Sequence, residues 1–183
     1  MTFYRRKLPH WQPEGMALFI NWRLHGSLPA KIQSRQTQNG SGKAFVAFDH
    51  LLDKATSGPL WLKDSRIAQL VTNALKFGES DLKLYRLDAF VIMANHVHVL
   101  LTPHAALSRI TEAIKGYTAQ KANEVLNRTG KRFWQEESFD HWVRNEEEFR
   151  RIMRYIEHNP VAAGLVEKPE YWSWSSATGR LIE

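Results

Sequence analysis

Two histidines separated by one apolar residue, His96 and His98, are the residues of this chain best suited to chemistry. They lie in a markedly apolar run, AFVIMANHVHVLLTP at residues 89–103. Because side chains along a β-strand alternate between its faces, a His-Val-His strand directs both imidazoles to one face and Val97 to the other. Neutral imidazole binds divalent metal ions, which usually take a third ligand from elsewhere in the chain. The pair indicates a metal site, although two histidines on one exposed strand face often have no role.

A second candidate group follows in a helix that the apolar spacing predicts over residues 108–126. Tyr117 continues the stripe of Ile110 and Ile114, which is typical of a helix face packed on a core. Gln120 lies three positions beyond Tyr117, on nearly the same face. Tyrosine can act as a covalent nucleophile, and a metal ion that polarises a phosphodiester would supply the other half of such a reaction. Without that context, Tyr117 is more simply interpreted as a packed residue.

Composition excludes several classes of protein. The chain has 183 residues and no cysteine, so it has neither a disulfide framework nor a thiolate metal site. Its longest apolar run is too short to cross a bilayer, and no apolar secretory segment follows the basic N-terminus. We therefore expect a cytoplasmic protein that contacts no membrane and needs no small-molecule cofactor.

The positive charge is unevenly distributed. The net charge is +6 and the isoelectric point about 9.7. Residues 1–36 hold six Lys or Arg against one acid, and residues 109–132 hold six against two, whereas residues 133–183 are acidic. Together with seven Trp and five Tyr, this pattern favours a polyanion with stackable bases as the partner. A merely solvated basic surface is the alternative.

The order of the predicted elements indicates the fold class. Asn145 can cap the last helix, with Glu148 completing a capping box, and Pro160 should end that helix. We expect one α+β domain over residues 1–183, with an antiparallel sheet and helices packed mainly on one face. A basic arm covers about residues 1–12 and a helical extension about residues 145–183. The expected strands are residues 17–24, 82–93 and 96–102, with the last two joined as a hairpin, and the expected helices are residues 44–54, 64–76, 108–126 and 145–160, with residues 133–144 irregular.

Several further motifs occur in one order along the chain: LPHW at 8–11, FINWRLHGSLP at 19–29, MANHVHVLLTP at 93–103, IKGYTAQKAN at 114–123, FWQEESFDHWVRNEEEF at 133–149, YIEHNPVAAGLV at 155–166 and YWSWSSA at 171–177. In this order they resemble the motifs of the REP-associated tyrosine transposases, within the HUH superfamily of single-strand DNA transposases. The resemblance covers nearly the whole chain. It departs from the family pattern at Ala94, where a proline is expected before Asn-His.

The resemblance implies a fold and a mechanism. It implies a ferredoxin-like antiparallel sheet that carries the histidine pair on a central strand. A tyrosine would attack a DNA phosphate, leaving a 5′-phosphotyrosine and a free 3′-hydroxyl. His96 and His98 would bind Mg²⁺ or Mn²⁺, and Tyr117 would be the nucleophile. The third metal ligand would be an amide on the helix of Tyr117, either Gln120 or Asn123, of which only Gln120 shares the face of the tyrosine.

Tyr155 is the alternative nucleophile, although packing in a core helix is its simpler interpretation. Candidate DNA contacts are basic residues that could hold phosphates, and aromatic and polar residues that could stack on or contact bases. For the N-terminal arm the alternative is a frayed, solvated end, and for the aromatic residues it is packing in the core. The basic candidates are Arg5, Arg6, Lys7, Lys115, Lys121, Arg128, Lys131 and Arg132, and the others are Trp134, His141 and Arg144.

Three functions remain open from the sequence. The first is a metal-dependent endonuclease and strand-transferase that acts on single-stranded DNA at hairpin repeats. The second is a DNA-binding protein of the same fold without cleavage activity. The third is a metal-dependent hydrolase of RNA or nucleotides that uses His96 and His98 with water. Monomer and dimer are both compatible with the sequence.

Overall fold

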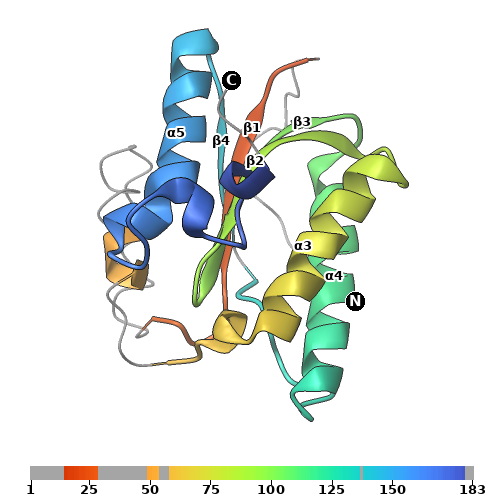
Figure 1. The fold of residues 1–183 in the computed structure, drawn as a ribbon. Helices are drawn as coiled ribbons and strands as arrows, with labels where there is room; N and C mark the ends of the chain where they lie inside the picture. The colour runs from red at the N-terminus through yellow and green to blue at the C-terminus, as the bar shows by residue number, and fades with distance from the viewer. Residues whose placement is uncertain (1–14, 29–48, 54–57, 137, 180–183) are drawn as a thin grey trace.

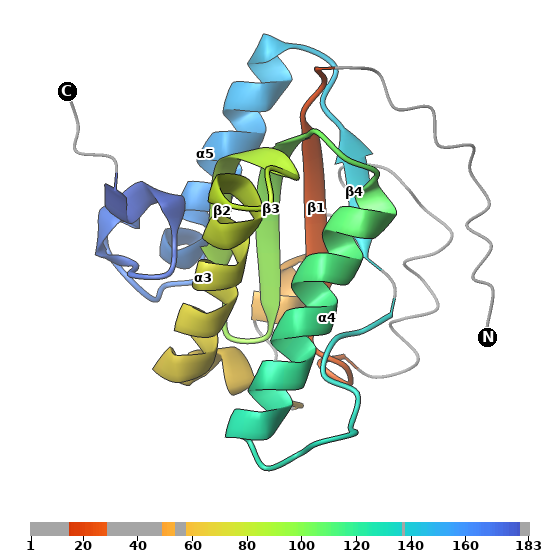
Figure 2. The same ribbon diagram turned by 90° about the vertical axis from the view of Figure 1, so that its right-hand side faces the viewer.

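Four antiparallel strands form one sheet in the order β2-β3-β1-β4, which Figure 2 shows from the side of two helices. The computed structural model describes residues 15–28, 49–53, 58–136 and 138–179. The elements are β1 (Leu18–Arg23), α3 (Ser65–Ser80), β2 (Tyr85–Ile92), β3 (His96–Pro103), α4 (Leu107–Val125), β4 (Phe139–Trp142) and α5 (Glu146–Ala162), with 3₁₀ helices η1 (Trp61–Lys63), η2 (Pro169–Tyr171) and η3 (Ser176–Gly179).

The chain order of strands and helices up to β4 is β-α-β-β-α-β, the ferredoxin-like arrangement. Strands β1 and β2 run parallel with β3 between them, and β3 and β4 run parallel with β1 between them. Each parallel pair is joined across the sheet by one helix, α3 or α4. Because such crossovers are almost always right-handed, both helices are directed to the same face.

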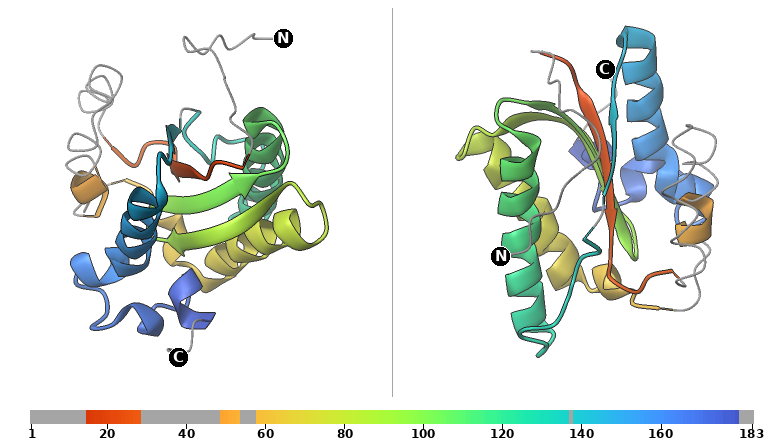
Figure 3. Two further views of the ribbon diagram at one scale, coloured as in Figure 1. Left: turned by 90° about the horizontal axis from the view of Figure 1, so that it is seen from above. Right: turned by 180° about the vertical axis from the view of Figure 1, so that it is seen from behind.

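Helices cover both faces of the sheet, because α5 packs on the face opposite to α3 and α4, as the views in Figures 1 and 3 show. One core lies between the sheet and α3 with α4, and includes Val97, Val99 and Ile114. A second core lies between the opposite face and α5, and includes Leu100 and Ile156. We expected the helices mainly on one face: α3 and α4 share one face, whereas α5 covers the other.

The expected antiparallel α+β fold is confirmed, and the differences are local. Strand β4 occupies part of the stretch that we expected to be irregular, because its residues pair with β1 from Leu18↔Trp142 to Asn21↔Phe139. Helix α5 continues two residues beyond Pro160, whose missing N–H falls in the last turn. Of the helix expected over residues 44–54, only residues 49–53 are described, and they are helical. Among the helices of the described residues, none combines the length and the apolarity needed to cross a membrane.

Candidate active site

His96 and His98 lie side by side on the face of β3 that α5 covers. Their ring centroids are 4.8 Å apart, and both side chains are fully buried. The Nδ1 atom of His96 is 2.7 Å from Oδ1 of Asn95, and Nδ1 of His98 is 2.9 Å from the side-chain amide of Asn21 on the neighbouring strand. Because each ring is held through Nδ1, its Nε2 remains the atom that can bind a ligand.

Two carboxylates from the helical segment 49–53 approach these Nε2 atoms. Oδ1 of Asp49 is 3.1 Å from Nε2 of His98 and 3.4 Å from Nε2 of His96, and Oδ1 of Asp53 is 3.8 Å from Nε2 of His96. Both acid side chains are almost inaccessible to solvent. The segment lies beside α5, shown in orange in Figures 1 and 3.

Helix α5 adds a tyrosine and an amide to the same site. The Tyr155 hydroxyl donates a hydrogen bond to Oδ2 of Asp49, and its ring packs edge-on against His98 at 5.8 Å between centroids. The Asn159 side chain donates to the same Oδ2 at 3.0 Å. Because Tyr155 and Asn159 are four positions apart, they project from one face of the helix.

The site has the donor set of a divalent-metal site. Asp49, His96 and His98 each offer one ligand atom, and these atoms lie within 4.8 Å of one another. Nε2 of His96, Oδ1 of Asp49, Oδ1 of Asp53 and Oδ1 of Asn159 are buried and make no hydrogen bond to any described residue. Leaving buried polar atoms without partners is costly, and a cation coordinated there would satisfy several at once. These residues therefore fit a metal ion.

The electrostatics of the site keep the ligands in the required forms. Burial lowers the pKa of His96 to about 3, so its imidazole is neutral at physiological pH. Burial alone would raise the pKa of Asp49, but the neighbouring His98 and His96 and a hydrogen bond from Tyr155 lower it below its usual value. Burial and the charge of Asp49 raise the pKa of Asp53 to about 7. The site thus holds the neutral imidazole of His96 beside the anionic carboxylate of Asp49, the forms in which such groups bind metal.

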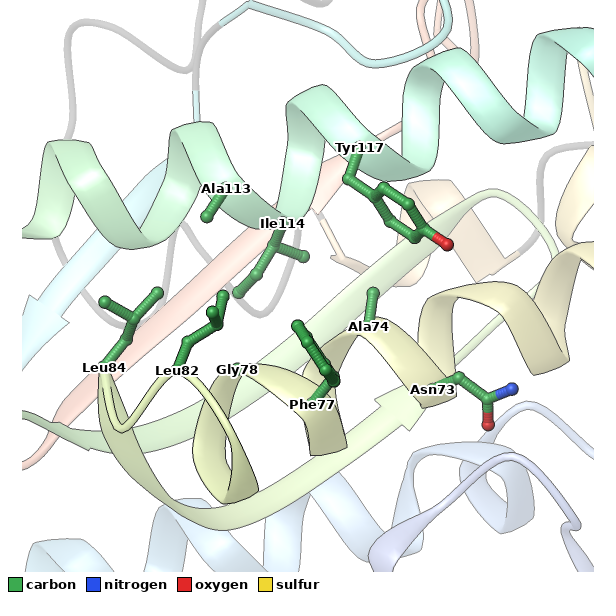
Figure 4. A pocket seen from close by; sticks show the side chains of 9 residues that line it. All are labelled: Asn73, Ala74, Phe77, Gly78, Leu82, Leu84, Ala113, Ile114 and Tyr117. Carbon is green, nitrogen blue, oxygen red and sulfur yellow. The ribbon is translucent and has the colours of Figure 1, made fainter.

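Tyr117 does not lie with the histidines, contrary to our expectation. Its helix, α4, packs on the opposite face of the sheet, where Ile114 contacts the core that contains Val97. The Tyr117 side chain is 51% exposed and lines a mostly apolar pocket of about 410 Å³ between α3 and α4 (Figure 4). The whole sheet therefore separates its hydroxyl from the metal-binding face.

The two amides expected as third ligands share that displacement because both belong to α4. Gln120 is exposed and donates to Glu124 at 3.2 Å. Asn123 is buried and donates to the carbonyl oxygen of Lys131 at 2.7 Å, so it ties the helix to the segment that follows it. Neither amide is placed to complete the site of His96 and His98.

The candidate DNA-contacting cations are mostly on α4 and the segment after it, and so do not surround the histidines. Lys115 donates to the backbone oxygens of Gln135 and Glu136, and Lys121 is paired with Glu124 at 2.8 Å. The guanidinium of Arg128 stacks on the Trp61 ring. The side chains of Lys131, Arg132 and Arg144 are exposed. Arg5, Arg6 and Lys7 lie outside the described residues.

The two aromatic candidates differ in position. Trp134 is a core residue: it is 7% exposed, packs edge-on against Trp22 and donates through Nε1 to Thr118, so its faces are not accessible to a base. His141 is half-buried on β4 and lies 3.1 Å from Glu148 of α5, on the metal-binding side of the sheet. Of the two, only His141 shares a layer with the site.

The sequence reasoning missed Asp49, Asp53 and Asn159. Asn159 had a detectable signal: with Tyr155 it places two polar side chains at i and i+4 on the helix face that also carries Ile156. Asp49 and Asp53 also show the i, i+4 spacing, but nothing local connects them to histidines more than forty positions later in the chain. Only the tertiary structure brings these segments together.

Comparisons with known proteins agree with this architecture. The model of the IS200-like transposase family matches residues 64–159. In fold, the chain is similar to a solved REP-associated tyrosine transposase bound to a REP hairpin, with a TM-score of 0.60 and 20% sequence identity over 96% of this chain and 82% of that one. A putative transposase from Deinococcus radiodurans R1 matches at a TM-score of 0.39 and 15% identity, over 84% of this chain and 98% of that one. No curated protein matches significantly.

Proposed function

Because the chain belongs to the family of IS200-like transposases, we propose that it nicks and joins single-stranded DNA at hairpin repeats, with Tyr155 as nucleophile. The observation that carries this proposal is the position of the Tyr155 hydroxyl, which is hydrogen-bonded to the carboxylate facing His96 and His98. The alternative that the sequence favoured, Tyr117, lies on the other face of the sheet. The hairpin substrate is proposed from the solved relative of similar fold, which is bound to a REP hairpin.

We base the proposed roles in the reaction on the buried side chains. His96 and His98 would hold Mg²⁺ or Mn²⁺ through Nε2, which their Nδ1 contacts leave directed into the site. Such an ion, when bound, polarises the scissile phosphate and stabilises the negative charge that develops on it. As Tyr155 gives up its phenolic proton, its oxygen forms a bond to phosphorus while the bond to the 3′-oxygen breaks, and that leaving oxygen takes up a proton. The products are a 5′-phosphotyrosine and a free 3′-hydroxyl, which later rejoining can use.

The environment of Tyr155 explains why positive charge is needed. Burial and the nearby Asp49 carboxylate raise the pKa of its phenol well above the usual value. A phenol is a poor nucleophile compared with its phenolate, so the hydroxyl needs a neighbouring cation to become reactive. His96 and His98, which lie beside it, are the residues that would bring such a cation close.

Two matched tyrosine variants test this function. Wild type, Tyr155→Phe and Tyr117→Phe are each incubated with 5′- and 3′-labelled single-stranded hairpin DNA and Mn²⁺, and the products are separated on a denaturing gel. Each substitution removes one hydroxyl and keeps the ring. We expect wild type and Tyr117→Phe to cleave and to form a covalent protein–DNA adduct, and Tyr155→Phe to form none.

The other outcomes select the other functions. An adduct with Tyr155→Phe but not with Tyr117→Phe would return the reaction to Tyr117 and refute the proposal. Cleavage without an adduct in all three proteins would indicate hydrolysis by water. Hairpin binding without cleavage by wild type would indicate a DNA-binding protein of this fold.

The cytoplasmic location of the protein stays a prediction.

A further inference from the structure

The Asp49 carboxylate lies between the metal-binding histidines and the Tyr155 hydroxyl, although none of the sequence motifs contains it. It stands 47 positions before His96 in the chain, in the helical segment 49–53 beside α5 (Figure 1). Its side chain is 2% exposed. A carboxylate is rarely buried so completely unless its charge has a specific partner. Its position therefore requires a role.

The two oxygens of Asp49 face different groups. Oδ1 faces the histidines, at 3.1 Å from Nε2 of His98 and 3.4 Å from Nε2 of His96. Oδ2 accepts hydrogen bonds from the Tyr155 hydroxyl and from the Asn159 amide. One carboxylate thus connects the metal-binding atoms with the nucleophile through its two ends.

The separations on the Oδ1 side match those between neighbouring ligands of one ion. Bonds of about 2.0–2.2 Å, directed at right angles, place adjacent ligand atoms about 3 Å apart. The observed separations of 3.1 and 3.4 Å are close to that value. Oδ1 of Asp49 also makes no hydrogen bond to a described residue, so the atom is available for coordination.

We propose that Asp49 is a further protein ligand of the divalent cation, beside His96 and His98, through Oδ1, and that through Oδ2 it positions Tyr155 for attack. The proposal rests on the proposed function for the identity of the nucleophile, but its metal-binding half stands independently. The amides of α4 lie on the opposite face of the sheet, whereas Asp49 offers a carboxylate on the metal-binding face, next to the amide of Asn159.

This arrangement has a chemical consequence. A hydroxyl that shares a carboxylate with the metal is held at a defined place relative to the metal-bound phosphate before the reaction begins. Such preorganisation contributes directly to rate, because small displacements of reacting atoms are costly. Loss of Asp49 should therefore weaken metal binding and, separately, slow the attack when metal is saturating.

The first test measures metal binding without DNA. Mn²⁺ is titrated calorimetrically into the full-length, metal-free wild type, Asp49→Ala, Asp49→Asn and Asp88→Asn. Asp88 is the matched control, because it is another nearly buried carboxylate but is bound to Arg86 and Thr102 on the edge of the sheet. We expect both Asp49 variants to bind Mn²⁺ at least about tenfold more weakly, since even loss of a group behind a ligand costs about that much. Asp88→Asn should bind as wild type does.

The second test separates positioning from metal binding. The rate of adduct formation is measured at saturating Mn²⁺ and saturating hairpin DNA. We expect Asp49→Ala to remain at least about tenfold slower than wild type, because the tyrosine is no longer held. Recovery of the full rate at saturating Mn²⁺ would overturn the positioning role.

The remaining outcomes are also decisive. Unchanged Mn²⁺ affinity in a folded Asp49 variant would overturn the assignment of Asp49 as a ligand. Faster cleavage by that variant would also overturn it, because the Asp49 carboxylate would then occupy the place that the substrate phosphate needs. If neither variant folds, anomalous scattering from Mn²⁺ in wild-type crystals decides, with an ion within about 2.2 Å of Oδ1 expected. A wild type that binds Mn²⁺ through Asp49 but forms no adduct would refute the proposed function alone.

Discussion

Asp53 should make the stability of the metal-free protein depend on pH in a direction opposite to that expected for Asp49, whose pKa is lowered by its neighbours. Its pKa is raised to about 7 by burial and by the charge of Asp49. Between about pH 4 and pH 7 the folded protein therefore keeps a proton on Asp53 that the unfolded chain has released. Stability contributed by this group falls as the pH rises through that range.

The size of the effect follows from the same shift. One pKa unit corresponds to about 1.4 kcal/mol, so Asp53 costs the folded state about 2.5 kcal/mol more at pH 8 than at pH 5. His96 acts in the other direction, because burial lowers its pKa to about 3 and the unfolded chain binds the proton below about pH 6.5. The two contributions nearly cancel in the wild type between pH 5 and pH 8.

Asp53→Asn removes one side of this balance. The free energy of unfolding is measured by urea denaturation in EDTA at intervals from pH 5 to pH 8. The difference between variant and wild type should grow by about 2.5 kcal/mol in favour of the variant as the pH rises. Glu147→Gln, which removes an exposed carboxylate at the start of α5, controls for net charge. A difference between Asp53→Asn and wild type that does not change with pH would contradict the raised pKa of Asp53.

Two further outcomes follow from packing and from charge. Gly78→Ala should destabilise the protein by about 1–3 kcal/mol in thermal unfolding, because the added Cβ would lie 2.8 Å from Cζ of Tyr85. The added Cβ of the control, Gly116→Ala, meets no atom within 4 Å, so that variant should be neutral or stabilising. Equal effects of the two substitutions would contradict the predicted clash with Tyr85. Replacing Lys131 and Arg132 by Ala should lower the slope of log affinity for single-stranded DNA against log salt by about 1.4, since each phosphate contact contributes about 0.7. An unchanged slope in a filter-binding titration would remove both residues from the DNA contacts.

Several features of this protein follow from local periodicity along the chain alone. His96 and His98 share one face of β3 because strand side chains alternate, and no tertiary information is needed for that. The hairpin of β2 and β3, the capped start of α5 at Asn145 and the antiparallel α+β class also followed from pattern and turn chemistry. Each of these depends on residues that are close in the chain.

The helix that covers the histidines could not be identified from local patterns. The spacing around Tyr117 predicts a helix that packs on a sheet, but it does not state which face of the sheet. The handedness of the two crossovers places α3 and α4 together, over Val97 and Val99. The opposite face is left for α5, so the tyrosine near the histidines is Tyr155 and not Tyr117.

The contribution of Asp49 was beyond any sequence pattern for the same reason. Its distance along the chain from the histidines means that no helix or strand period connects them, and only folding brings Oδ1 within 3.1 Å of His98. Burial then creates the chemistry, because removing these side chains from water shifts the pKa values of Asp53, His96 and Tyr155 together. Local periodicity orients a side chain, whereas its neighbours and its desolvation exist only in the folded chain.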